Sequence, residues 1–77
     1  MPKYYKAYSA SHDETLYLTV DDSGAVIIRD EAGHKVFLSR YQAKLMKFGI
    51  KGLLKDLFGS DDSSDVKIEE LKEPAFK

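Results

Sequence analysis

Five cationic side chains between residues 40 and 55 form a charge run of a single sign, and no acidic residue lies from Ala32 to Lys55. Projected on a helix at about 100° per residue, they fall within a sector roughly 80° wide. They form one row, the basic stripe, made of Arg40, Lys44, Lys47, Lys51 and Lys55. Such a row can follow the phosphates of a nucleic-acid strand. Like charges one turn apart repel each other, so either an external anion or the chain's own acidic segments offset them, or a solvent-exposed helix face tolerates them.

Three tyrosines provide a second candidate surface. Alternation in residues 15–20 places Leu16 and Leu18 on one face of a strand and Tyr17 on the other. Tyr4 and Tyr8 share one face of an earlier strand, and we expect them on the same outer face as Tyr17. Tyrosines on an open sheet can stack on bases, which is worth about 1–3 kcal/mol per base. The same rings would equally suit a dimer interface or support a second layer.

The sequence contains no signature of catalysis. It has no phosphate-binding glycine loop, dinucleotide fingerprint, nucleophile elbow or metal-ligand spacing. Only His12 and His34 could act as a general base near neutral pH, and their neighbours indicate a solvated loop and a turn. Ser39 has a capping role already. We therefore predict a protein that is not an enzyme and needs no cofactor or metal.

A helix must position the basic stripe, and its limits are clear in the sequence. Ser39 and Gln42 have the spacing of a capping box, which predicts a helix that begins at Arg40. Gly59 is well placed as the residue that follows its end.

The apolar residues of this helix do not share one face. The faces differ by roughly 150°, and the change falls at Gly49. Either the helix breaks or bends near Gly49, or it is continuous and buries one side under its sheet and the other against a partner subunit. One face carries Tyr41, Leu45 and Phe48, and the other carries Ile50, Leu53, Leu54 and Leu57.

Four strands are predicted before the helix, over residues 3–8, 15–20, 25–30 and 35–38. Turns at Asp21–Gly24 and Glu31–His34 join the later strands. The predicted fold class is α+β: an antiparallel four-stranded β-meander followed by a helix on one face. Residues 65–71 alternate weakly and form either a late edge strand, a helical turn or a tail that orders only on binding.

Length and composition indicate one small domain. We expect residues 1–59 to form the β-β-β-β-α domain and residues 60–77 an acidic tail, flexible or contributing a late strand. There is no cysteine, and no stretch has the length of a membrane span, so a soluble cytoplasmic protein is expected. A core this small would gain from dimerisation, and a homodimer is predicted.

The layout, with Lys35-Val36-Phe37-Leu38-Ser39 at the junction of sheet and helix, is similar to that of small dimeric coactivator domains that bind single-stranded DNA. The preferred interpretation is a non-catalytic nucleic-acid-binding domain, with single strands favoured and no membrane or small-molecule ligand. The alternative is a protein-interaction module, either a small regulator or inhibitor or a dimerising adaptor. That module would dock through Ile50, Leu53, Leu54 and Leu57.

Overall fold

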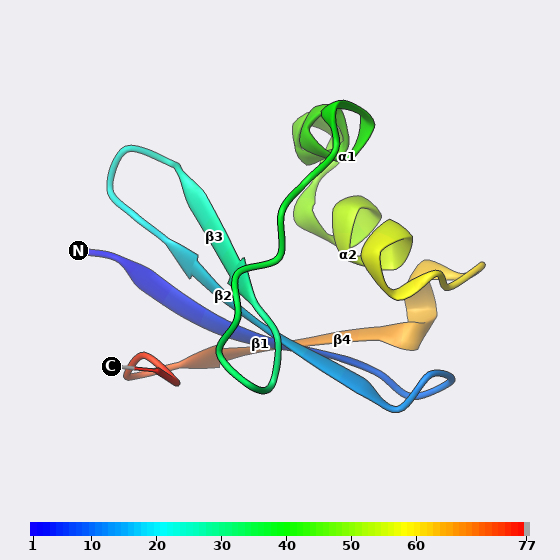
Figure 1. Cartoon of the computed structure of the whole chain (residues 1–77), viewed down its shortest axis with the longest axis horizontal. Coiled ribbons are helices and arrows are strands. Elements are labelled where there is room, and N and C mark those ends of the chain that lie inside the picture. The colour runs from blue at the N-terminus through cyan, green and yellow to red at the C-terminus, as the bar shows by residue number, and fades with distance from the viewer. Residues whose placement is uncertain (77) are drawn as a thin grey trace.

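The computed structural model describes residues 1–76, which form an α+β fold with one four-stranded antiparallel sheet. Figure 1 shows the helices on one side of this sheet. The predicted fold class is confirmed. The strands are β1 (Lys3–Ser9), β2 (Glu14–Val20), β3 (Val26–Arg29) and β4 (Val66–Leu71), in the order β3-β2-β1-β4. The helical elements are α1 (Arg40–Leu45), the 3-10 turn η1 (Met46–Phe48), α2 (Ile50–Phe58) and the 3-10 turn η2 (Ser63–Asp65).

The fourth strand is not the one predicted over residues 35–38. That segment makes only an isolated bridge between Arg29 and Lys35 and a hydrogen bond from Val36 N to Ile28 O of 2.8 Å. Only Lys35 and Val36 engage β3, since the helix cap follows at Ser39. β4, from the C-terminal segment, completes the sheet instead by pairing antiparallel with β1. Of the three structures predicted for this segment, the late edge strand is therefore confirmed.

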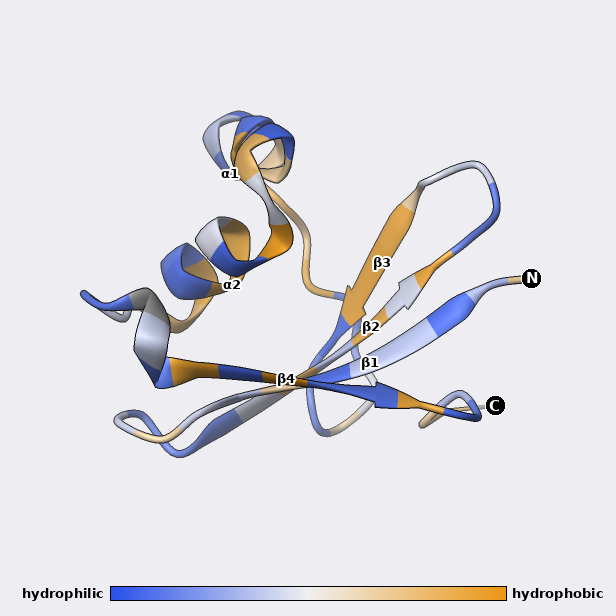
Figure 2. Cartoon of the chain, turned by 180° about the vertical axis from the view of Figure 1, so that it is seen from behind, coloured by the Kyte–Doolittle hydropathy of each residue, from blue (hydrophilic) through white to orange (hydrophobic). Residues whose placement is uncertain are grey.

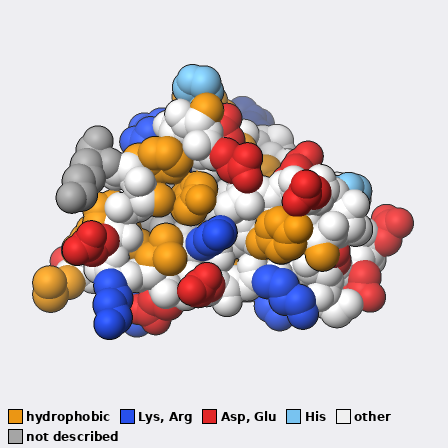
Figure 3. Space-filling view, turned by 90° about the horizontal axis from the view of Figure 1, so that it is seen from below, with side chains coloured by type: hydrophobic (Ala, Val, Ile, Leu, Met, Phe, Trp, Pro, Cys, Tyr) orange, Lys and Arg blue, Asp and Glu red, His pale blue; other side chains and the backbone are white. Residues whose placement is uncertain are grey.

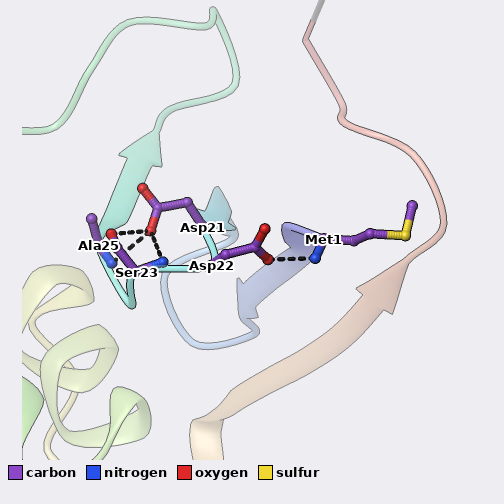
Figure 4. A network of polar contacts seen from close by, with 5 residues as sticks. All are labelled: Met1, Asp21, Asp22, Ser23 and Ala25. Atoms are coloured by element: carbon purple, nitrogen blue, oxygen red, sulfur yellow. Dashed lines mark hydrogen bonds and ion pairs between the residues drawn. The ribbon is translucent and has the colours of Figure 1, made fainter.

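The β2–β3 hairpin is closed by the carboxylate of Asp21 (Figure 4). One oxygen of Asp21 accepts hydrogen bonds from Ser23 N at 2.9 Å, Ser23 Oγ at 2.6 Å and Ala25 N at 3.0 Å. These bonds, the Ser23 hydroxyl first, lower the pKa of Asp21. Gly24 has a φ of 90°, as the turn requires, and the N-terminal amino group of Met1 pairs with Asp22. The predicted turn is confirmed.

The core lies between α2 and the inner face of the sheet. Leu53 and Leu54 of α2 are both 0% exposed. They were predicted to form an interface with a partner, but the structure places them in the core of their own chain, where they cover the sheet. Figure 2 shows the hydrophobic parts of α2, β3 and β4 in orange. The buried apolar residues are Ala7, Leu16, Leu18, Ile28, Leu53, Leu54, Phe58 and Val66.

A serine–aspartate cluster fastens β4 to β1. Asp65 accepts hydrogen bonds from the hydroxyls of Ser60 at 2.6 Å, Ser11 at 2.8 Å and the fully buried Ser9. Its other oxygen accepts from Ser11 N at 2.9 Å. These bonds, the one from Ser60 first, hold the pKa of Asp65 well below its usual value. In its ionised form this carboxylate therefore ties the chain just before β4 to the end of β1 and the loop that follows it.

The helical region is broken at Gly49, as one of the two alternatives predicted. Ser39 Oγ accepts from Gln42 N at 3.1 Å, and Gln42 Oε1 accepts from Ser39 N at 3.0 Å, so the predicted capping box is present. Gly49 has φ 115° and ψ 152°, which is not a helical conformation. Gln42 Nε2 also donates to Asp56 Oδ2 of α2 at 3.0 Å and holds the two helices together.

Candidate binding surfaces

The basic stripe does not form one line of charge. Arg40 and Lys44 lie on α1, Lys47 lies on η1, and Lys51 and Lys55 lie on α2. A common row over all five would require one continuous helix, and the chain changes direction at Gly49. The three cations before the break keep their i, i+4, i+7 spacing on residues 40–48. The predicted stripe is therefore reduced to a group of three.

This group of three is not neutralised by ion pairs with the described residues. Within residues 1–76 the ion pairs are those of Met1 with Asp22 and of His34 with Asp30. Lys55 has a different environment, because it is half-buried and faces Asp62. The pKa of Asp62 is lowered first by the Ser64 N–H and further by the charge of Lys55.

Exposed aromatic rings lie beside the three cations, and sequence reasoning missed their exposure. Neither α1 nor η1 contains a buried residue. Phe37 is 85% exposed, Tyr41 63% and Phe48 84%. Tyr41 and Phe48 follow Arg40 and Lys47 by one residue, so an aromatic row lies about 100° from the cationic row on the same helical unit. We call this region the α1–η1 surface: Arg40, Lys44 and Lys47 with Tyr41 and Phe48.

The α1–η1 surface continues into a shallow hollow where α1 meets α2. The hollow has a volume of about 340 Å³. Tyr41 and Leu45 line it from α1, and Lys55 and Asp56 line it from α2. The remaining lining residues are Gly52, Ser60 and Asp61.

The three tyrosines lie together on the outer face of the sheet. The register pairs Tyr4 with Thr19, Lys6 with Tyr17 and Tyr8 with Thr15, so all three rings project from the same face, as predicted. Each ring is half-buried. The hydroxyl of Tyr8 donates to Asp13 Oδ1 at 3.0 Å, and this bond raises the pKa of Tyr8.

Part of this outer face is covered by the C-terminal segment. The ring of Phe76 packs edge-on against Tyr17, with ring centroids 5.3 Å apart and an interplanar angle of 89°. Figure 3 views the molecule from the side of this face, and side chains of both charges are interspersed there with hydrophobic ones. The outer face is therefore a mixed surface rather than a basic one.

The sheet separates the two halves of the predicted site. The helices pack on the inner face, whereas Tyr4, Tyr8 and Tyr17 project from the outer one. The cations of α1 and η1 and these three tyrosines therefore belong to opposite sides of the sheet. The rings that accompany the cations are Tyr41 and Phe48 instead.

The fold and these surfaces define a small α+β domain that exposes aromatic and cationic side chains on a short helical unit. Comparison of the chain with protein-family models, curated proteins and solved structures finds no match. In the part of the chain that the structure describes, no helix is long and apolar enough to cross a membrane. The same residues contain no group of three or more histidine, aspartate or glutamate side chains that could hold a metal ion.

Proposed function

We propose that this chain is a non-catalytic binding domain that holds single-stranded nucleic acid on its α1–η1 surface. The observation that supports the proposal is the pairing of two rows on residues 40–48. One row is cationic and has no ion-pair partner among the described residues, and the other exposes Tyr41 and Phe48 to solvent. We also propose that the domain acts in the cytoplasm, where such strands are accessible.

Each row has a separate task in this proposal. Arg40, Lys44 and Lys47 contact phosphate oxygens, and the guanidinium of Arg40 can engage one phosphate with two N–H groups. Tyr41 and Phe48 stack on bases, which contributes about 1–3 kcal/mol per base. Bases in a duplex have their faces covered by their neighbours, so the aromatic row favours unpaired strands.

The interrupted stripe sets a definite salt dependence. Each phosphate neutralised on a single strand contributes about −0.7 to the slope of log K against log salt, so three contacts give a slope near −2. Five cations in one line would give a slope near −3.5 by the same rule. The measured slope thus reports how many members of the predicted stripe act together.

The test is a titration of the purified chain into labelled single-stranded and duplex oligonucleotides, followed by fluorescence anisotropy at several salt concentrations. Lys44→Gln should reduce the magnitude of the slope of log K against log salt by about 0.7. Lys72 is also exposed but lies outside the α1–η1 surface, so Lys72→Gln should leave the slope unchanged. Phe48→Ala should weaken binding about 5- to 150-fold. Its ring is 84% exposed, so the fold should be unaffected. No binding at about 50 mM salt, or equal effects of the two lysine variants, would refute the proposal.

A protein partner is the second candidate, and the exposure of Phe37 favours it. Phe37 is 85% exposed on the segment that precedes the capped helix, and aromatic residues are enriched in protein–protein interfaces. Of the apolar face predicted for docking, Leu53 and Leu54 are in the core, and Ile50 and Leu57 are half-buried against it. Binding that is lost in Phe37→Ala and depends little on salt would support this second candidate over the first.

A further inference from the structure

β4 leaves one complete edge of the sheet unpaired. On one side it pairs with β1 without interruption from Val66 to Leu71, so it contains neither a bulge nor a proline. Within residues 1–76 no strand pairs with its other side, because β4 ends the sheet. The opposite edge, β3, is shorter and partly covered by the bridge at Lys35. Unpaired N–H and C=O groups along β4 can accept a strand from another chain.

The side chains of β4 carry opposite charges on one face. Lys67 and Glu69 project from the outer face, where they pair with Tyr8 and Lys6 of β1. Ile68 lies between them and projects toward the inner face, beside Ala7. A hollow with a volume of about 390 Å³ lies against β4 at this edge. The hollow is lined by Lys6, Tyr8, Lys67, Ile68 and Glu69.

If two copies of β4 pair antiparallel to form one continuous sheet, the outer faces of both copies must lie on the same side of that sheet. Registers that meet this condition are centred on a residue of the strand, since a shift by one residue would exchange the faces. A register centred on Glu69 places two glutamates opposite each other, and one centred on Lys67 does the same with two lysines. Centred on Ile68, the register sets each Lys67 opposite Glu69 of the second copy. Opposite charges in directly facing positions are favourable, and like charges are unfavourable.

We propose that a second copy of this chain binds along β4, antiparallel and centred on Ile68, so that the two sheets become one continuous sheet. Each Glu69 then lies between Lys6 of its own β1 and Lys67 of the second copy. The two Ile68 side chains meet on the inner face. This dimer goes beyond the proposed function and does not depend on it, because β4 carries no residue of the α1–η1 surface.

The test uses charge reversal and measures mass in solution by sedimentation over a range of concentrations. The unaltered chain should dimerise. Lys67→Glu and Glu69→Lys should each weaken dimerisation roughly tenfold, because two opposed pairs become like-charge pairs. Lys35 is exposed and lies outside β4, so Lys35→Glu should not change the dimerisation affinity. Circular dichroism of each variant checks that the fold is retained.

Mixing the two variants makes the test specific to this register. A Lys67→Glu chain carries two acids at the paired positions and a Glu69→Lys chain carries two lysines, so every facing pair in their heterodimer has opposite charges. An equimolar mixture should therefore form a one-to-one heterodimer of about the original affinity. A monomeric unaltered chain at submillimolar concentration would overturn the proposal. A dimer insensitive to both single variants, or a mixture that does not associate, would also overturn it.

Discussion

Gly49 determines where the helical region breaks, and its replacement tests this directly. A φ of 115° with a ψ of 152° lies in a region that is essentially restricted to glycine, and other residues there lose about 1–3 kcal/mol. An added Cβ would meet no atom within 4 Å. Gly49→Ala should therefore lower the free energy of unfolding by about 1–3 kcal/mol, through backbone strain alone.

Gly52 provides a matched comparison of opposite sign. It lies inside α2, its φ is not positive, and a Cβ there would also meet nothing within 4 Å. Gly52→Ala should raise the free energy of unfolding by about 1 kcal/mol, the usual gain for this change within a helix. In a domain of this size 1 kcal/mol corresponds to about 4–8 °C in Tm. The two variants should thus shift Tm in opposite directions.

The assay is urea denaturation followed by far-UV circular dichroism, with the unaltered chain measured alongside. If Gly49→Ala stabilises the protein as Gly52→Ala does, and its helical signal rises, the glycine does not impose the break. The helix would then be continuous and the basic stripe restored. In that case the salt slope of nucleic-acid binding should steepen from about −2 toward −3.5 in the same variant.

Three further predictions concern polar and aromatic contacts that hold the sheet. Ser9→Ala should lower the free energy of unfolding by about 1.5–3 kcal/mol, since the buried hydroxyl donates to a charged acceptor, and urea denaturation measures this. The lowered pKa of Asp65 favours the folded state above its ordinary value of 3.8, and that stability is lost as pH falls below it. Asp65→Asn should therefore be less stable at neutral pH but less sensitive to acid, as melting temperatures between neutral and strongly acidic pH would show. Phe76→Ala should remove about 0.5–1.5 kcal/mol of edge-on packing and expose Tyr17, which tyrosine fluorescence and a thermal melt can detect.

The features predicted correctly from the sequence depend on short-range chemistry. The capping box needs only Ser39 and Gln42, and the hairpin turn needs only Asp21 to Gly24. Likewise, the alternation that turns Tyr17 away from Leu16 and Leu18 follows from the geometry of a single strand. These local patterns predict the structure correctly because no distant segment of the chain competes for the same position.

The features that were missed depend on competition between distant segments. Residues 35–38 and the C-terminal segment are both strand candidates, and only the second forms a strand of the sheet, because Asp65 anchors it beside Ser9 and Ser11. Two apolar rows flank Gly49, and only one can cover the sheet. The row on α2 does so with Leu53, Leu54 and Phe58, which leaves the aromatic row without a place in the core.

The break at Gly49 therefore has two consequences for the proposed site. It divides the five cations, so that no more than three can act along one helical unit. By ending η1 at Phe48, it also lets α2 alone supply the buried residues of the segment 40–58, and Tyr41 and Phe48 remain in solvent beside Arg40, Lys44 and Lys47. A continuous helix would have a longer row of charge, but it would have to bury or partner both apolar rows. Because of the conformation of Gly49, the protein has a shorter row of cations but exposes aromatic rings beside it. Proteins that bind single-stranded nucleic acid combine these two kinds of side chain.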